Sequence, residues 1–229
     1  TFMILGNICT RSCQFCGVKT GRPGIVDWSE PLKVAKSIQI MKVKHAVITS
    51  VDRDDLKDGG ASLWVETVKS IRKLNPATTL ETLIPDFKGE NKDLDKIIKV
   101  MPEVISHNLE TVRRLTREVR VQAKYDRSLY VLKYLKQQGV NRTKSGIMLG
   151  LGETESEVLD TLHDLRDANV DIVTIGQYLQ PSKKLLQVKE FITPEQFDKY
   201  AQIAKDIGFI HVESGPLVRS SYKAHKHIK

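Results

Sequence analysis

The chain has 229 residues, a length that suits one large domain or two small ones and allows a sizeable hydrophobic core. Hydrophobic residues make up 40% and charged residues 28%, which excludes a disordered or low-complexity chain. The 36 Lys and Arg outnumber the 28 Asp and Glu by 8, which favours an anionic partner without identifying one. No apolar run approaches the roughly 20 residues of a membrane helix, so we expect no membrane partner.

Short apolar runs alternate with amphipathic stretches along the whole chain. In chain order the pattern predicts a strand at 2–5, a helix at 29–41, a strand at 46–51, a helix at 61–74, strands at 79–84 and 104–106, a helix at 126–138, a strand at 145–151, a helix at 154–168, a strand at 172–178, a helix at 193–207 and a strand at 210–212.

Residues typical of helix ends support these boundaries. Ser29 and a Thr-x-x-Glu capping box at Thr154 begin two of the helices, and Pro194 lies just inside a third. Strands separated by helices of this length predict parallel β/α units. With about six repeats we expect an α/β fold, a partial (β/α)6 TIM-type barrel, in one domain covering 1–229.

All three cysteines lie within eight residues, with the spacing C-x3-C-x2-C at Cys9, Cys13 and Cys16. Crowded cysteines in an otherwise cysteine-free chain indicate a reducing compartment and a metal rather than a disulfide framework. A structural zinc site needs a fourth ligand, and no further Cys or His lies nearby in the sequence. Three thiolates fit a [4Fe–4S] cluster that leaves one iron open to an outside ligand.

This motif, with Phe15 before its last cysteine and a short strand before its first, resembles the radical S-adenosylmethionine (SAM) superfamily. The resemblance implies that Cys9, Cys13 and Cys16 ligate a [4Fe–4S] cluster whose open iron is chelated by SAM. It also implies reductive cleavage of SAM, followed by hydrogen abstraction from an unactivated carbon. The protein then places cofactor and substrate and excludes water.

Further strings across nearly the whole chain resemble the lipoyl synthase family. They are TSVDRDDLKDGGA at 49–61, HNLETVRRLTREVR at 107–120, TKSGIMLGLGETE at 143–155, TIGQYLQPS at 174–182 and SGPLVRSSY at 214–222. In that family the second serine of the RSSY motif ligates an auxiliary [4Fe–4S] cluster, which maps to Ser221 in the C-terminal segment 214–229.

One part of the family pattern is absent from this sequence. The family carries three more cysteines, spaced C-x4-C-x5-C, before the radical SAM motif, and this chain has none. Because the chain starts within an apparent strand, we expect that an N-terminal segment precedes it. We therefore expect this chain alone to hold one cluster, where a complete family member holds two.

The implied reaction inserts sulfur at C6 and C8 of an octanoyl chain on a lysine of a carrier protein. The resemblance implies octanoylated lipoyl domains of 2-oxo-acid dehydrogenase complexes, or the glycine-cleavage H protein, as partners. It also implies an electron donor such as ferredoxin or flavodoxin. We expect a cytoplasmic location, or an organelle matrix if a targeting segment is removed.

Polar residues follow several of the predicted strands, at the sheet edge where barrel active sites lie. As SAM-contacting candidates we name Phe15, Ser50, Asp52, Arg53, Glu81, Asn108 and Lys144. Glu81 lies among apolar neighbours, so its carboxylate needs a partner, for which a ribose hydroxyl or an arginine would serve. For His107 we favour a structural hydrogen-bonding role, since abstraction by a carbon radical needs no base.

Two alternatives stay open at this point. One is another SAM-dependent sulfur-inserting enzyme, similar to biotin synthase, whose product is a thioether ring on a free small molecule. The other is a zinc-stabilised basic module that binds nucleic acid. The aromatic residues are scattered without an interleaved basic and aromatic motif, so we expect no nucleic-acid partner.

Overall fold

The computed structural model describes residues 1–228. Seven parallel strands form one sheet in the order β1-β4-β5-β6-β7-β8-β9. Their bounds are β1 Phe2–Ile4, β4 His45–Ser50, β5 Thr79–Leu83, β6 Val104–Ser106, β7 Thr143–Leu149, β8 Ile172–Gln177 and β9 His211–Gly215. Among these described strands β1 and β9 are the two edges, so the sheet is an open, partial barrel.

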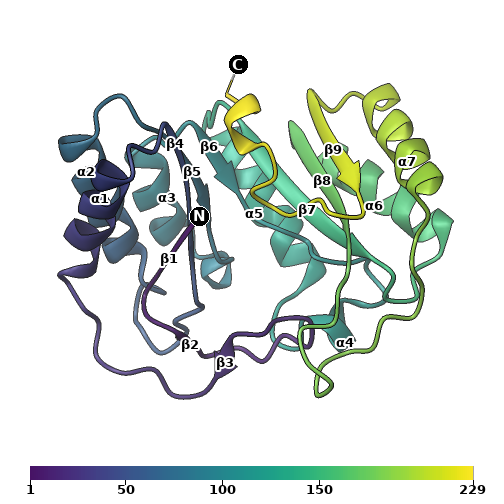
Figure 1. Cartoon of the computed structure of the whole chain (residues 1–229), viewed down its shortest axis with the longest axis horizontal. Helices are drawn as coiled ribbons and strands as arrows, with labels where there is room; N and C mark the ends of the chain where they lie inside the picture. Colours follow the sequence, from purple (N-terminus) through teal and green to yellow (C-terminus); the bar gives the residue numbers. More distant parts are fainter. Residues whose placement is uncertain (229) are drawn as a thin grey trace.

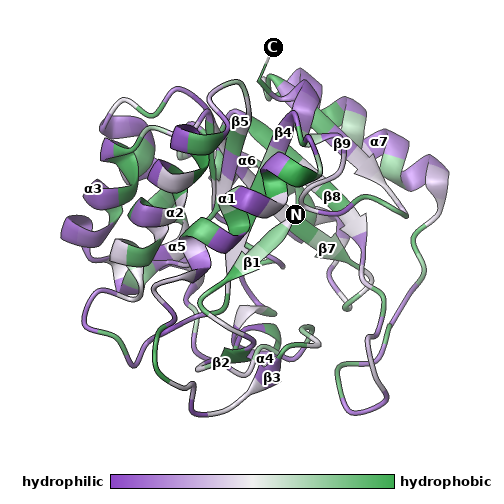
Figure 2. Ribbon diagram, turned by 60° about the vertical axis from the view of Figure 1, so that its left-hand side comes forward, coloured by the Kyte–Doolittle hydropathy of each residue, from purple (hydrophilic) through white to green (hydrophobic). Residues whose placement is uncertain are grey.

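Helices cover the outer side of the curved sheet, and the C-terminal segment lies on its inner side (Figure 1). The helices are α1 Glu30–Ile40, α2 Ala61–Leu74, α3 Asn91–Lys99, α4 Thr116–Val119, α5 Tyr125–Gln137, α6 Glu155–Asp167 and α7 Pro194–Asp206, with short 3-10 turns η1 Phe87–Gly89 and η2 Ala224–Lys226. Figure 2 shows both hydrophilic and hydrophobic residues along the outer helices, as expected for helices with one buried face.

The hydrophobic core consists of two clusters of buried side chains. One joins α1, α2 and α3 to the first strands and includes Ile38, Trp64 and Leu80. The other joins α6 and α7 to the last strands and includes Leu162 and Phe197. Between them, β6 and β7 pair through only two positions, Ile105 with Thr143 and Ser106 with Lys144. Buried polar side chains, among them Glu81, Ser106 and Lys144, lie at this junction, which we call the polar centre of the barrel.

Every predicted strand and helix is present, with ends that agree with the prediction or shift by up to three residues. The last strand is the largest correction, since it reaches Gly215 instead of ending at 212. The capping box of Thr154 and Glu157 is confirmed. Ser29 precedes α1 as predicted, but its hydroxyl donates to Asp27 and does not cap the helix.

The sequence pattern missed α3, α4 and a small parallel pair formed by β2 (Ile8–Cys9) and β3 (Lys19–Thr20). The α3 sequence NKDLDKIIK is short and mostly polar, and only Leu94 and Ile97 among its apolar residues are buried. α4 is a single turn. These elements are stabilised by tertiary packing rather than by local propensity.

No helix within residues 1–228 is long and apolar enough to span a membrane.

Candidate functional site

The loops that follow β1, β4, β5 and β6 meet at one edge of the sheet around a cavity of about 270 Å³. Parallel strands place their carboxyl ends together, which brings these loops to one edge. The cavity is lined by Cys9, Cys13, Cys16, Phe15, Ser50, Asp52, Asn108 and Glu110, among others. The structure thus brings the three cysteines and four of the predicted SAM contacts together with Glu110, which was not among the predicted site residues.

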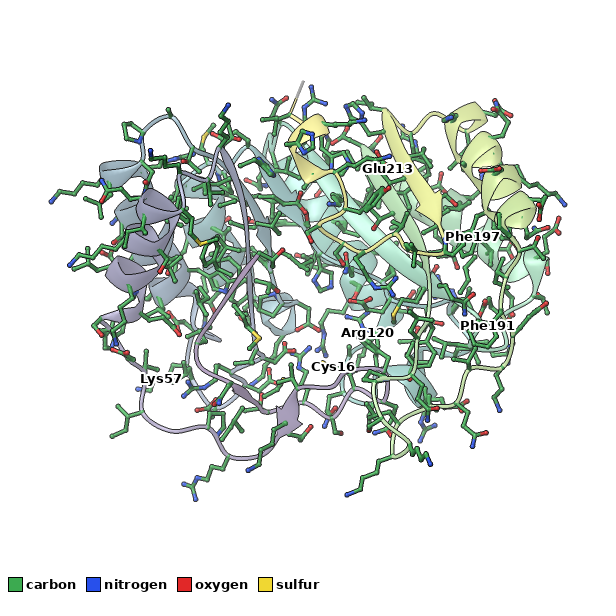
Figure 3. The ribbon with its side chains drawn as sticks, in the orientation of Figure 1. Cys16, Lys57, Arg120, Phe191, Phe197 and Glu213 are labelled. Atoms are coloured by element: carbon green, nitrogen blue, oxygen red, sulfur yellow. The ribbon has the colours of Figure 1, made fainter. Side chains whose placement is uncertain are left out.

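The cysteine loop, residues 9–16, is held by backbone N–H groups that point at its sulfur atoms. The amides of Arg11 and Asp52 donate to Cys9 Sγ at 3.4 and 3.3 Å, and the amide of Val18 donates to Cys16 Sγ at 3.5 Å. Such bonds favour a thiolate. Figure 3 shows Cys16 and Arg120, which line the same cavity, below the sheet.

Apart from these N–H groups, the surroundings of the three thiols destabilise negative charge on the sulfur atoms. Burial raises the pKa of all three thiols, that of Cys13 to about 12, and nearby carboxylates of Asp52 and Glu110 add to the effect. A positively charged metal centre bound directly to the sulfur atoms would favour their thiolate forms at this site. An iron–sulfur cluster is such a centre.

A single mononuclear metal ion does not fit as well. Within residues 1–228 there is no group of three or more His, Cys, Asp or Glu side chains placed to hold one ion. Cysteines that ligate separate irons of a cluster need not converge on one point. Among these residues the structure therefore offers no tetrahedral zinc site.

Arg11, which the sequence reasoning did not single out, anchors the cysteine loop to two other loops. Its buried guanidinium donates to both carboxylate oxygens of Asp54 at 2.7 and 2.9 Å and to Asp86 at 2.6 Å, and it lies 3.4 Å from Asp52. Burial opposes the charge, but the hydrogen bonds to Asp54 and Asp86 outweigh it and raise the pKa of Arg11. The three carboxylates cannot be recognised as partners from the local sequence.

Asp52 faces the cavity next to Cys9. One of its carboxylate oxygens lies 3.8 Å from Cys9 Sγ, and its backbone carbonyl accepts from the amide and hydroxyl of Thr10. Burial raises the pKa of this carboxyl group, while Arg11 acts in the opposite direction. Asp52 thus links the loop after β4 to the cysteine loop and adds an acceptor to the cavity.

Asn108 and Glu110 line the same cavity as the cysteine loop. The amide nitrogen of Asn108 donates to Glu110 Oε1 at 3.1 Å, whereas its buried carbonyl oxygen Oδ1 has no partner. Burial raises the pKa of Glu110, whose backbone has a positive φ of 67°. Ser50 Oγ is likewise buried without a partner. Unpartnered buried polar atoms that line a cavity suit a ligand carrying hydroxyl or amino groups.

Three of the predicted SAM contacts have other partners. Arg53 pairs with Asp55 and donates to backbone carbonyls, one of which belongs to Gly24. Glu81 and Lys144 pair with each other, Nζ to Oε1, at 2.9 Å. The expected partner of Glu81, an arginine or a ribose hydroxyl, is therefore corrected to a lysine. None of the three side chains lines the cavity beside the cysteines.

His107 is buried and bonded on both ring nitrogens. Nδ1 lies 2.9 Å from the carbonyl oxygen of Ile84, and Nε2 lies 2.9 Å from Ser128 Oγ. Burial lowers its pKa to about 4, which keeps the ring neutral. These bonds support the structural role favoured from the sequence.

A second cavity of about 280 Å³ adjoins the first and shares Phe15, Asn108 and Glu110 with it. Arg219 and Ser220 of the C-terminal segment contribute to its wall. Ser221 does not line either cavity, although it follows Ser220 directly. Its predicted role as a ligand stays a prediction.

The sequence matches the model of the Radical SAM superfamily over residues 3–165. It is 75% identical over 228 residues to a mitochondrial lipoyl synthase of Nematostella vectensis and to a lipoyl synthase of Flavobacterium psychrophilum, covering all of this chain and 78% and 79% of those proteins. A lipoyl synthase of Treponema denticola is 56% identical over 228 residues, covering all of this chain and 78% of that protein.

Solved structures share the fold at low sequence identity. Streptococcus suis SuiB bound to S-adenosylmethionine has a TM-score of 0.74 and 10% identity, over 98% of this chain and 51% of SuiB. HydG, a maturase of the [FeFe]-hydrogenase, has a TM-score of 0.70 and 14% identity, over 93% of this chain and 56% of HydG. These likenesses support the partial barrel fold.

Proposed function

The chain belongs to the lipoyl synthase family of the radical SAM superfamily, and we propose that Cys9, Cys13 and Cys16 hold its SAM-binding [4Fe–4S] cluster. The family's reaction inserts sulfur at C6 and C8 of a protein-bound octanoyl-lysine and uses [4Fe–4S] clusters and SAM. Membership decides against the biotin-synthase-like and zinc-module alternatives. The arrangement of the three cysteines and unpartnered polar atoms around one cavity carries the assignment of the site.

The cluster that Cys9, Cys13 and Cys16 would hold would supply the electron for reductive cleavage of SAM, which in this family provides the means of hydrogen abstraction from the octanoyl chain. The residues of this chain bind and orient. The amide N–H groups that point at Cys9 and Cys16 stabilise negative charge on the sulfur atoms. Arg11 holds the loop between the first two cysteines against Asp54 and Asp86.

SAM has ribose hydroxyls, an amino group and a carboxylate, and the cavity offers matching groups. Asn108 Oδ1 and Glu110 would accept hydrogen bonds from hydroxyls, and Ser50 Oγ would donate or accept. Apolar side chains that line the same cavity, among them Val51 and Ile84, would cover the adenine and exclude water. Phe15 lines both cavities and lies between the proposed SAM site and the second cavity.

The second cavity is where we place the octanoyl chain and the segment that carries Ser221. The family resemblance supports Ser221 as the oxygen ligand of the auxiliary cluster, and the position of Ser220 in the cavity wall supports a nearby location. Lipoyl domains are the substrates of the family. We propose octanoylated lipoyl domains of 2-oxo-acid dehydrogenases or the H protein as carriers, ferredoxin or flavodoxin as reductant, and a bacterial cytoplasm or organelle matrix as location.

The deciding experiment measures iron and sulfide per chain after anaerobic reconstitution, together with SAM binding by equilibrium dialysis. We expect about four irons per chain, lost on Cys13→Ala. Asn108→Ala should weaken SAM binding at unchanged iron content, whereas the exposed loop variant Asn141→Ala should not. Retention of four irons by Cys13→Ala would contradict the ligand assignment, and about eight irons would show that unidentified ligands hold a second cluster.

A further inference from the structure

A lysine and a glutamate are completely buried in the polar centre of the barrel. Glu81 on β5 and Lys144 on β7 are both 0% exposed, and their strands are separated by β6. Lys144 Nζ donates to the two Glu81 oxygens at 2.9 and 3.2 Å, and Ser106 on β6 donates to Oε1 at 2.7 Å. Burying two charges costs free energy, so a functional role could explain why this pair is present at the centre of the barrel.

The ammonium of Lys144 has a third proton, and it is directed at the C-terminal segment. Nζ donates to the backbone carbonyl of Ser220, 76 residues further along the chain. The side chain of Ser220 is held as well, since its hydroxyl accepts from Asn108 Nδ2 at 2.9 Å. Both the carbonyl and the hydroxyl of one residue in the C-terminal segment are thus bonded to side chains of the barrel interior.

The backbone before Ser220 is also closely seated. A Cβ added at Gly176 on β8 would lie 2.3 Å from the carbonyl oxygen of Val218, so only glycine allows this approach. Arg219 Nη1 donates to the carbonyl of Gln177 at 3.4 Å, and the amide of Tyr222 donates to the carbonyl of Arg219 at 2.8 Å. We call residues 219–222 the serine turn; its two serines are half-buried against the barrel, whereas the side chains of Arg219 and Tyr222 are exposed. Figure 1 shows the C-terminal segment crossing the inner side of the sheet.

We propose that Lys144 is a positioning residue that fixes the serine turn to the barrel interior, with Glu81 holding the ammonium in place. The lysine thereby determines where the hydroxyl of Ser221 is presented. The significance of that hydroxyl as a ligand rests on the proposed function, whereas the attachment of the turn does not. The attachment of the turn lies next to the proposed SAM site, because Asn108, which bonds Ser220, lines both cavities.

A simpler role for Lys144 is to neutralise Glu81. The two roles predict different results for a variant that lacks both charges. Under neutralisation alone, the variant Glu81→Gln/Lys144→Met recovers the unfolding free energy lost in Lys144→Met, and the serine turn stays as protected as in the wild type. Under our proposal the stability recovers, but the turn is freed because its carbonyl has lost the donor.

Amide hydrogen exchange of residues 214–228, measured by mass spectrometry on the iron-free chain, distinguishes them. We expect the double variant to exchange at Tyr222 and Ala224 at least about tenfold faster than wild type, at a similar unfolding midpoint. Gly176→Ala keeps both charges but should displace the turn, because its added Cβ would collide with the carbonyl oxygen of Val218. Its exchange rate therefore serves as the reference for a displaced turn. Lys136→Met, which removes the Lys136–Asp171 pair beside the start of β7, is the matched control and should leave the turn protected.

Wild-type exchange of the turn in the double variant would overturn the proposal. If Lys144→Met alone does not fold, the double variant still decides the outcome. Since no iron is present in this measurement, an error in the cluster ligands would appear in the iron content and leave the exchange rates unaffected.

Discussion

At the scale of single residues, Arg11 shows how a side chain between Cys9 and Cys13, two of the proposed cluster ligands, can fix the position of their loop. Arg11 and Arg53 are equally buried, with 4% of each side chain exposed, but they bond to different parts of the structure. Arg11 connects the cysteine loop to Asp54 and Asp86, whereas Arg53 bonds Asp55 outside the cavity. A buried cation with several carboxylate partners rigidifies the segment that carries it.

Arg11→Met should therefore loosen the cysteine loop. We expect a loss of unfolding free energy of roughly 3–5 kcal/mol, because the carboxylates around Arg11 lose their counter-charge. The iron-free variant should also react several-fold faster with a thiol reagent, measured from the absorbance of the released thiolate. Arg53→Met is the control, since it removes an equally buried arginine away from the thiols. Equal thiol reactivity in the two variants would mean that the effect is general destabilisation.

At the scale of elements, His107 joins three segments that differ in sequence position. It lies directly after β6, bonds the carbonyl of Ile84 after β5, and contacts Ser128 in α5. Ser128 also accepts from Arg120, so its own hydroxyl proton is available for Nε2 of a neutral ring. Protonation of His107 would remove that acceptor and place a cation beside Arg120.

This arrangement predicts a dependence of stability on pH. The pKa of His107 is about 4 in the folded protein, below its ordinary value of 6.5. Above pH 6.5 both folded and unfolded chains are neutral at this residue, so its contribution is intact. As the pH falls from 6.5 towards 4, only the unfolded chain takes up the proton, and the unfolding free energy decreases by up to about 3 kcal/mol.

Urea unfolding at a series of pH values measures this slope. His107→Gln should flatten it between pH 6.5 and 4, while the exposed α6 variant His163→Gln should retain the wild-type slope. An unchanged slope in His107→Gln would show that other groups cause the acid sensitivity.

At the scale of the whole molecule, the polar centre divides the core into two clusters. Ile71 in α2 belongs to the cluster of the first strands, and Leu162 in α6 to that of the last strands. The two halves meet where β6 and β7 share only two paired positions and where Glu81 bonds Lys144. A boundary at which the two strands share so few paired positions favours partial unfolding of one half.

Ile71→Ala and Leu162→Ala should each lower the unfolding free energy by about 2–5 kcal/mol, since both side chains are fully buried. Hydrogen exchange in low urea should show the larger loss of protection in the half that carries the substitution. A uniform loss across both halves would indicate that the barrel unfolds as one unit.

Local patterns in the sequence were enough to predict the order of strands and helices along the chain and to identify the cysteine motif. Apolar periodicity, the capping box at Thr154 and the spacing of Cys9, Cys13 and Cys16 are readable because all their parts lie within one element or loop. The prediction missed α3 although Leu94, Ile97 and Ile98 lie at helical spacing, because the segment is short and mostly polar.

Only the tertiary structure decided which charged residues are partners. Arg11 meets Asp54 and Asp86 across 43 and 75 residues, and Lys144 meets Glu81 across 63. The tertiary structure also brings Glu110 to the cavity that the cysteines line. The sequence prediction named Asn108, two residues earlier, but not Glu110. Partners of this kind depend on the register and curvature of the sheet, which the packing of the whole core determines and which leave no periodic signal in the chain.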